Sequence, residues 1–227
     1  RLTRMPALIQ WWTQDLQQLS PTAFEDAVFA HGSDVLRRWT EPHRRYHNTR
    51  HLVEVFWALE ELEQVDEISA DEAVVARVAA WFHDAVYDPR ATAGANESDS
   101  ADLARELLPG LDVDPDQVEQ IASLVLLTAG HDGEAPDGLT RSFLDADLWI
   151  LAAEPSRFDA YCEQIRAEYA HVPDPAYRAG RAALLEDLRD RPALYRTAHA
   201  RAQWEPRARN NLDRELTRLA APALDLA

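Results

Sequence analysis

Apolar residues recur along much of this chain at intervals of three and four positions, which is the spacing of one buried face of an α-helix. Three stretches show this pattern most clearly. No stretch alternates apolar and polar residues with a period of two, so no β-strand is expected. The predicted buried faces are Leu52, Val55, Phe56, Leu59 and Leu62; Val74, Val75, Val78, Ala79 and Phe82; and Val118, Ile121, Leu124, Val125 and Thr128.

Residues that favour helix ends and loops separate these stretches. Ser69-Ala70-Asp71-Glu72 is predicted to form a capping box at the start of the second helix, with each side chain binding the other residue's backbone N–H. Small and polar residues from Ala91 to Ser100 predict a loop that enters a helix near Asn96, and a second loop is expected from Gly130 to Leu139. The sequence therefore predicts an all-α fold, in one domain over residues 1–227.

The amino-acid composition and charge limit the kinds of partner that the protein is expected to bind. The chain has 227 residues, of which 46% are hydrophobic and 28% charged, as is typical of a soluble globular protein with a sizeable core. The longest apolar run, Ile121 to Ala129, is too short to cross a bilayer, so no membrane partner is expected. The formal net charge of −17 disfavours duplex nucleic acid, because such binding depends on neutralising phosphates. A homo-oligomer is compatible with this composition.

The numbers of lysine and cysteine residues exclude several kinds of mechanism and cross-link. All 23 basic residues are arginine, because the chain contains no lysine. Mechanisms that need a catalytic lysine, such as Schiff-base formation or the Walker phosphate loop, are thereby excluded. Cys162 is the one cysteine, so no disulfide can form within these residues. We therefore expect a reducing, cytoplasmic setting.

Four short stretches carry nitrogen and oxygen donors in an order that indicates a metal site. His47 and His51 are four residues apart, which places both on one face at the start of a helix. His83 and Asp84 lie in the apolar run Trp81 to Val86, where a carboxylate needs a cation or several hydrogen-bond donors. Imidazole and carboxylate groups hold hard or borderline divalent cations without thiolates. The four stretches are Tyr46–His51, His83–Asp84, Gly130–Asp132 and Asp145–Asp147.

The order and context of these stretches resemble the HD superfamily of metal-dependent phosphohydrolases. The similarity is greatest to a bacterial group described only as predicted metal-dependent HD phosphohydrolases. This resemblance implies an HD-domain helical bundle with additional N- and C-terminal helices and a core at about residues 41–216. The segments that carry it are Tyr46–His51, Trp81–Asp84, Tyr87–Pro89, Asn96–Ser100, Leu144–Leu148, Ile165–Tyr169, Tyr177–Arg181 and Ala208–Leu212.

The resemblance implies a divalent metal ion as cofactor, with Mn, Fe, Co, Mg, Ni and Zn all open. The implied ligands are His51, His83, Asp84 and Asp147. Asp145 is the alternative fourth ligand, although the residues around Asp147 fit the HD pattern better. Whether one or two ions bind stays open. HD proteins with a complete two-metal site have two additional histidines before the last acid, and only His131 lies in that interval here.

Three residues are candidates for proton transfer. His47 resembles the first histidine in the signature of cyclic nucleotide phosphodiesterases, which protonates the leaving oxygen in those enzymes. The His-Pro-Gly expected after Asp84 in those enzymes is absent, so the resemblance supports this role more than a cyclic nucleotide substrate. Asp88 occupies the place of an acidic pair in stringent-response HD hydrolases and would orient or deprotonate water, unless it merely ends a helix before Pro89. Glu97 is the third candidate, and its alternative role is to stabilise a helix N-terminus.

Four residues are candidates for substrate binding. Arg178 and Arg181 offer bidentate contacts to phosphate oxygens, and the alternative is that they pair with the acids Glu186–Asp187 on a solvated face. Arg50 lies inside the histidine motif. His131 would contact substrate or a second ion, and its alternative is a solvated loop residue beside glycines.

These features together predict a metal-dependent hydrolase of phosphate esters or anhydrides. By analogy with the superfamily, the substrate is a nucleotide or a related small phosphorylated metabolite. Two other classes stay open. One is an HD-type di-iron oxygenase, which the scarcity of histidines before Asp147 disfavours. The other is a non-catalytic helical binding module that retains the metal ligands.

Overall fold

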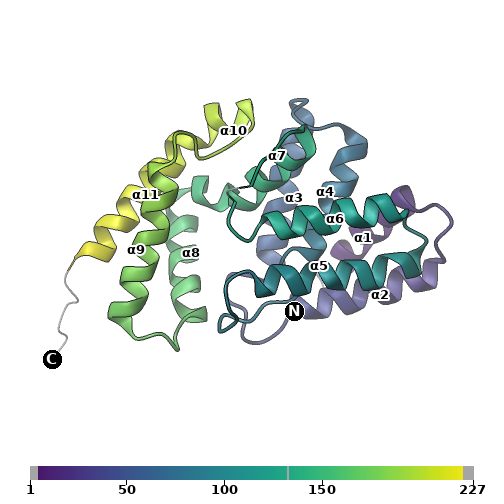
Figure 1. Cartoon of the computed structure of the whole chain (residues 1–227), viewed down its shortest axis with the longest axis horizontal. Coiled ribbons are helices and arrows are strands. Elements are labelled where there is room, and N and C mark those ends of the chain that lie inside the picture. Colours follow the sequence, from purple (N-terminus) through teal and green to yellow (C-terminus); the bar gives the residue numbers. More distant parts are fainter. Residues whose placement is uncertain (1–4, 132, 222–227) are drawn as a thin grey trace.

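Residues 5–131 and 133–221 of the chain, described here from a computed structural model, form helices joined by loops, with no β-strand among them (Figure 1). The predicted all-α class is therefore confirmed. None of these helices is both long and apolar enough to cross a membrane. The elements are α1 (Met5–Leu19), α2 (Glu25–Arg38), α3 (Thr49–Gln64), α4 (Ala70–Phe82), α5 (Ala95–Leu107), η1 (Leu108–Leu111), α6 (Pro115–Leu127), α7 (Gly138–Asp147), η2 (Leu148–Ala152), α8 (Pro155–Glu168), α9 (Asp174–Asp190), α10 (Ala198–Gln203) and α11 (Glu205–Ala220).

Helix starts follow the capping residues in the sequence. The Ser69 hydroxyl accepts a hydrogen bond from the backbone N–H of Glu72, whose carboxylate accepts one from the backbone N–H of Ser69, so the predicted capping box is confirmed. Asp114 and Asp137 accept backbone N–H groups in the first turns of α6 and α7. Such caps matter because the first N–H groups of a helix lack partners within it. The predicted loop after residue 91 enters α5 at Ala95, close to the expected position.

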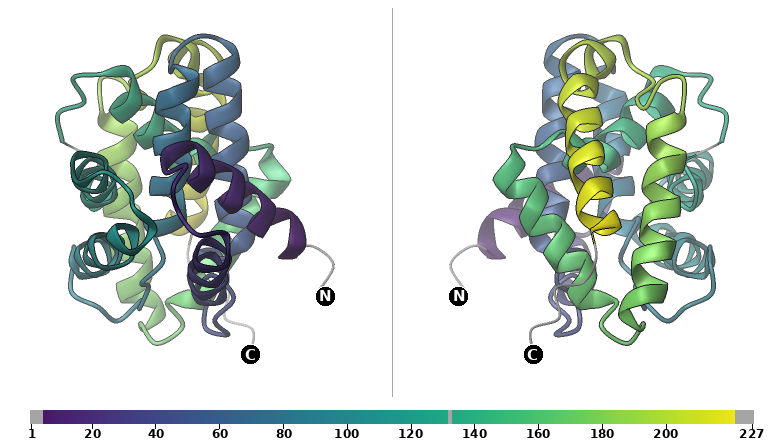
Figure 2. Two further views of the ribbon diagram at one scale, coloured as in Figure 1. Left: turned by 90° about the vertical axis from the view of Figure 1, so that its right-hand side faces the viewer. Right: turned by 90° about the vertical axis from the view of Figure 1, so that its left-hand side faces the viewer.

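The helices lie in two groups. In the first, α3 packs on α4 and α7, α4 packs on α6, and α5 packs on α6, with α1 and α2 against α4. In the second, α11 packs on α9, and both α8 and α11 contact the short helix η2 that directly follows α7. The side views show α9 and α11 next to each other (Figure 2). The end of α7 therefore joins the two groups and carries residues that face both.

A tryptophan cluster anchors the core beside the end of α4. Every residue of the three predicted apolar faces is buried. Trp12 and Trp81 are fully buried and pack edge to face, with ring centroids 5.4 Å apart. Trp39 is also fully buried, and its indole N–H donates to the carbonyl of Trp81 at 2.9 Å. This bond fixes the backbone two residues before His83.

Candidate metal centre

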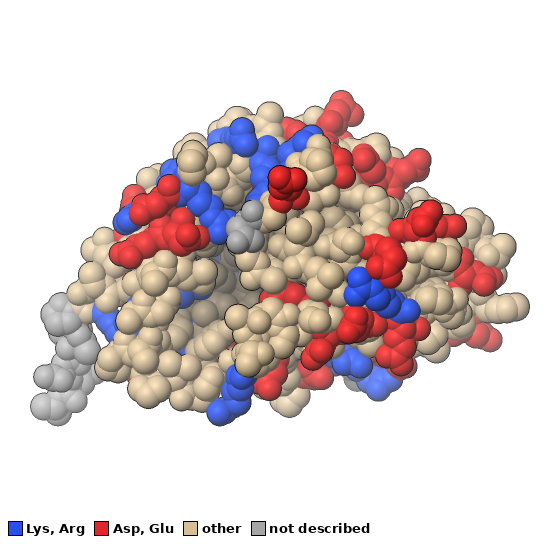
Figure 3. Space-filling view, viewed as in Figure 1, with Lys and Arg blue, Asp and Glu red and all other residues tan. Residues whose placement is uncertain are grey.

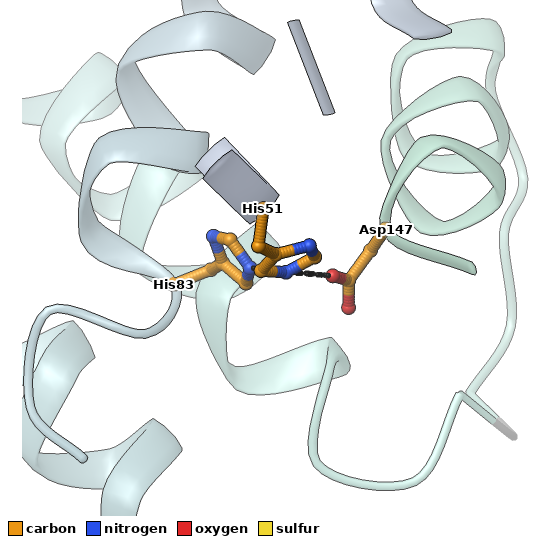
Figure 4. Close-up of side chains that lie close together, drawn as sticks. All are labelled: His51, His83 and Asp147. Carbon is orange, nitrogen blue, oxygen red and sulfur yellow. Dashed lines mark hydrogen bonds and ion pairs between the residues drawn. The ribbon is translucent and has the colours of Figure 1, made fainter. Parts of the chain in front are cut away.

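Side chains from three separate parts of the chain converge on one point. His51 lies in the first turn of α3, His83 directly follows α4, and Asp147 is the last residue of α7. Figure 4 shows these three side chains pointing toward one another, and their donor atoms all lie within 4.8 Å of one another. Asp84 adds a carboxylate oxygen 3.5 Å from His51 Nε2 and 3.1 Å from His83 Nε2. His51, His83 and Asp147 therefore form a group that could hold a metal ion, and Asp84, the remaining ligand expected from the resemblance, lies beside it.

The spacing of the donor atoms fits one divalent ion. Asp147 Oδ1 lies 3.2 Å from Nε2 of both His51 and His83, and the two Nε2 atoms are 3.0 Å apart. Ligand atoms that each lie about 2.1 Å from one ion are separated by about 3.0 Å at a right angle and about 3.4 Å at a tetrahedral angle. The observed separations fall in this range, so the residues present can hold such an ion.

The hydrogen-bond partner of His83 supports the same conclusion. Its Nδ1 lies 2.8 Å from the carbonyl oxygen of Ala80, which can only accept, so Nδ1 carries the hydrogen. In the neutral ring, Nε2 is then an acceptor, yet it faces His51 Nε2 and carboxylate oxygens of Asp84 and Asp147. This concentration of lone pairs in a buried place needs positive charge at its centre, either protons or a metal ion.

Protons fill that role when no metal is bound. Burial opposes the charged form of His83, but the charges of Asp84 and Asp147 outweigh burial and raise the pKa of His83 well above its usual value. Burial likewise opposes charge on His51, and hydrogen bonds to the same two acids raise its pKa. Burial also acts against the charged acids, but chiefly the neighbouring His83 charge holds the pKa of Asp84 and of Asp147 well below the usual value. The cluster therefore favours a bound cation.

Aromatic side chains surround the two histidines. The hydroxyl of Tyr46 lies 2.9 Å from His51 Nδ1, and burial raises the pKa of Tyr46 well above 10.0, so the phenol stays neutral. The centroid of the Trp39 ring lies 5.4 Å from that of the His83 ring, and the Phe143 ring packs edge to face against His83 with centroids 6.3 Å apart. Partners on the second ring nitrogen fix the orientation of a ligating histidine. The surroundings thus leave little room for either imidazole to turn.

The carboxylates of Asp145 and Asp147 have different partners. The backbone N–H of Arg196 is shared between the two carboxylate oxygens of Asp145, at 2.8 and 2.9 Å, and the backbone N–H of Thr197 donates to Oδ2 at 2.7 Å. Burial raises the pKa of Asp145 although these N–H groups oppose the rise. The side chain of Asp145 therefore holds the start of α10, while Asp147 faces the two histidines. This arrangement favours Asp147 as the fourth ligand.

His131 contacts the outer oxygen of this ligand. Its Nε2 lies 2.8 Å from Asp147 Oδ2, and it lines the cavity next to the cluster. Its backbone has a φ of 51°, and its carbonyl accepts a hydrogen bond from Arg191 Nη1 at 2.9 Å. His131 is thus held at the site and is not a solvated loop residue. Asp132, the next residue of the motif, lies outside the described residues.

His47 lies beside the cluster but not in the helical position expected for it. Helix α3 begins at Thr49 because the Asn48 side chain accepts the N–H of Arg50 and so caps it. His47 therefore precedes the helix and does not share a helix face with His51. The two imidazole rings nevertheless lie 6.0 Å apart, and both line the same cavity.

Glu168, the last residue of α8, is the residue that holds His47. Its Oε2 lies 2.7 Å from His47 Nδ1, and its Oε1 accepts the backbone N–H groups of Arg45 at 2.7 Å and Tyr46 at 2.8 Å. Tyr87 donates its hydroxyl to Oε2 at 2.8 Å. Burial would raise the pKa of Glu168, but the hydrogen bond to His47 and the other donors lower it to about 2. Glu168 is therefore a carboxylate at neutral pH.

Glu168 is a functional residue that the sequence pattern did not indicate. The segment Ile165–Tyr169 resembled the family pattern, but the partner His47 lies 121 positions earlier, and contacts over such a distance leave no periodic signal. One sequence signal could have indicated it. Glu168 has apolar and aromatic neighbours at a predicted helix end, and a carboxylate buried there needs hydrogen-bond donors.

Arg44 is a second supporting residue that the sequence analysis missed. Its side chain is fully buried, and Nη1 donates to the carbonyls of His47 at 3.0 Å and Asp84 at 2.7 Å, while Nη2 donates to Ala85 at 3.0 Å. The guanidinium also lies over the Tyr87 ring, 5.5 Å from its centroid. Arg44 thus ties the segment before α3 to the segment after α4, and both segments carry residues of the site.

The two predicted acids have different positions. Glu97, in the first turn of α5, lines the cavity. Asp88 does not line it. Helix α4 ends at Phe82, so Asp88 does not follow Asp84 on one helix face. Asp88 is exposed, its carboxylate accepts the N–H of Arg90, and its backbone N–H bonds Asn96. The structure does not bring Asp88 to the ligand cluster.

Of the three predicted arginines, one lines the cavity. Arg50 is largely exposed and pairs with Glu54, one helical turn along, at 3.1 Å. Arg178 donates to backbone carbonyls at the end of α11, namely those of Arg218, Leu219 and Ala221. Neither of these two is among the lining residues. Arg181 is buried and does line the cavity.

The cavity has a volume of about 520 Å³ and lies between the two groups of helices. His51, Asp84 and Asp147 line it, together with apolar and aromatic residues of α8 and α9. Figure 3 shows a hollow in this face of the molecule with both acidic and basic atoms beside it. A cavity of this size fits a small molecule of the size of a nucleotide.

Comparison with known proteins adds no relative to this picture. No family model, curated protein or solved structure matches the chain. Any assignment of activity therefore depends on the order of the motifs and on the geometry of the cluster.

Proposed function

We propose that the protein is a metal-dependent hydrolase of phosphate esters or anhydrides, related to the HD superfamily, acting on a nucleotide or another small phosphorylated metabolite in the cytoplasm. The observation that carries this proposal is the convergence of His51, His83, Asp84 and Asp147 beside a histidine held by a buried carboxylate. A divalent ion bound to these ligands would supply an activated water at neutral pH and polarise a phosphoryl oxygen.

The His47–Glu168 pair supplies a proton donor. Because Glu168 accepts the proton of Nδ1, the nitrogen of His47 left to hold and release a proton is Nε2. The hydrogen bond to the carboxylate also fixes the orientation of the ring from which a proton would pass to a leaving oxygen. The ring of His47 stacks on Tyr87 with centroids 4.2 Å apart, and this contact restrains its rotation.

The remaining polar residues of the site have positioning roles in this proposal. His131 binds the outer oxygen of Asp147 and so restrains the rotation of that carboxylate. Arg44 holds the backbone of Asp84 and of His47, so that the metal ligand and the proton donor keep a fixed separation. Glu97 lines the same cavity and is the acid available to contact the attacking water.

A screen of phosphate esters and anhydrides with Mn, Co, Mg, Fe, Ni and Zn tests the proposal. We expect hydrolysis with at least one metal and its loss in His83→Ala. His31→Ala is the matched control, because His31 lies on α2 and does not line the cavity. Retention of full turnover in His83→Ala would show that the assigned site is wrong. A protein that binds metal and hydrolyses none of these substrates would favour the non-catalytic binding module.

A further inference from the structure

Arg181 is a buried cation without a carboxylate partner in the described part of the chain. Its residue exposure is 8%, and the hydrogen bond its guanidinium makes is to the neutral hydroxyl of Tyr161, at 2.6 Å from Nη2. Its Nε is buried with no hydrogen-bond partner. The guanidinium lies 5.1 Å from the centroid of the Tyr161 ring, and both residues line the cavity. A buried charge of this kind is normally compensated by an opposite charge.

The residue before it gives an independent observation. Gly180 lies inside α9, where glycine weakens a helix relative to alanine. A Cβ atom added at Gly180 would meet nothing within 4 Å, so no neighbouring side chain requires glycine there. Gly180 lines the cavity next to Arg181. Open space over the backbone beside an uncompensated cation is the arrangement expected where a ligand approaches closely.

We propose that Arg181 and the open surface of Gly180 form an oxyanion subsite, which binds a second anionic group of the substrate away from the metal-binding cluster. A guanidinium binds both the tetrahedral oxygens of phosphate and the planar oxygens of carboxylate through charge-assisted hydrogen bonds. Nη2 is engaged with Tyr161 and Nε is buried, so Nη1 is the nitrogen through which the guanidinium can donate to such an anion.

The walls between the two positions define the middle of the ligand. Apolar and aromatic side chains of η2, α8 and α9 line this part of the cavity, and they include Ile150, Leu151, Ile165, Tyr169, Tyr177 and Leu188. Provided that the proposed hydrolase function holds, the substrate is a molecule with a phosphate at one end, an apolar or aromatic middle, and a second oxyanion at the other end.

Anion binding by metal-free protein tests the subsite independently of hydrolysis. Chelator-treated protein is titrated calorimetrically with inorganic phosphate and, separately, with succinate, and the melting temperature is followed in parallel. We expect wild type to bind at least one of the two anions. Arg181→Gln should weaken that binding by about tenfold or more, since hydrogen bonds to charged groups are worth at least that factor. Arg189→Gln removes a charge from an exposed position of the same helix and should leave the binding unchanged.

A second variant guards against misfolding as the cause. Gly180→Leu keeps the arginine and fills the open space, and it should weaken the same binding while the far-ultraviolet circular dichroism stays helical. Binding of both anions by Arg181→Gln with wild-type affinity would overturn the subsite, and so would a wild type that binds neither. Which of phosphate and succinate binds more tightly identifies the second group.

Turnover then links the subsite to the proposed function. For a substrate with two anionic ends, Arg181→Gln should raise KM about tenfold with a smaller change in kcat. For a monoester with one anionic end, KM should not change. Equal effects on both substrates would overturn the link to a two-ended substrate. Anion binding without any hydrolysis would leave the subsite standing and refute the hydrolase function, so the two failures are distinguishable.

Discussion

Glu168 Oε2 and His47 Nδ1 form a hydrogen bond of 2.7 Å between the last residue of α8 and the loop before α3. The carboxylate also accepts the backbone N–H groups of three consecutive residues, Arg45, Tyr46 and His47. One buried acid therefore fixes both the path of the loop and the ring orientation of the proposed proton donor.

Replacing this acid tests its positioning role. In Glu168→Gln, the amide keeps one acceptor but no longer stabilises a positive charge on His47. We expect kcat to fall about 10- to 100-fold with a smaller change in KM, a part of the 10²- to 10⁴-fold contribution typical of general acid–base catalysis. The loss should appear in kcat because the carboxylate positions the ring of the proposed proton donor and does not contact substrate. A loss of stability alone would lower the melting temperature and leave the kcat of the folded protein unchanged.

Acid stability offers a second readout of the same residue. The pKa of Glu168 is lowered from 4.5 to about 2 by its hydrogen-bond donors, despite burial. A lowered pKa contributes stability above the unfolded value, and that stability is lost as pH falls from 4.5 toward 2. The loss should be about 3 kcal/mol in wild type and absent in Glu168→Gln. Denaturant unfolding curves at several pH values give the difference, with exposed Glu163→Gln on the same helix as control.

Metal binding should release protons. His83 and His51 have pKa values raised above 6.5 in the metal-free cluster, so protons occupy it at neutral pH. A raised pKa stabilises the fold below 6.5, and this contribution is lost as pH rises through the folded-state value. The melting temperature of chelator-treated protein should therefore fall above pH 6.5, and a bound divalent ion should restore it. Calorimetric heats should vary with the ionisation enthalpy of the buffer, and identical heats in all buffers would refute the proton exchange.

Two glycines should respond oppositely to alanine. At Gly180 nothing obstructs a methyl group, so Gly180→Ala should stabilise the protein by about 0.8 to 1 kcal/mol through helix propensity. At Gly32 the methyl group would overlap the buried ring of Trp12, and Gly32→Ala should destabilise it by about 1 to 3 kcal/mol. Thermal unfolding measures both, with about 2 to 4 °C expected per kcal/mol at this size. Destabilisation by Gly180→Ala would contradict the open space seen there.

The sequence predicted what depends on local periodicity. The apolar faces of α3, α4 and α6 and the capping box at Ser69 were all found correctly, since each is set by residues three or four positions apart. The approach of His51, His83 and Asp147 to one another was also anticipated, because motif order carries information that spacing alone does not. Asp147 could be preferred over Asp145 on that basis, and the structure supplies the physical reason in the backbone partners of Asp145.

Features that depend on tertiary contact were beyond such reasoning. His47 was expected on a helix, but the cap at Asn48 starts α3 two residues later than that expectation required. Asp88 was expected one helical turn beyond Asp84, but the backbone leaves the helix at Phe82. Arg44 and Glu168 act through partners distant in the chain, and nothing in the periodicity of the sequence marks them.

Helix α7 ends in two acids that face different partners, Asp145 the backbone that starts α10 and Asp147 the histidine cluster. Any movement of Asp147 when an ion enters or leaves is therefore transmitted along a rigid half-turn to Thr197. Amide hydrogen exchange at the start of α10 should slow when the ion is present, although that segment supplies no ligand. Hydrogen exchange in the C-terminal third of the chain would therefore report whether an ion is bound at the cluster.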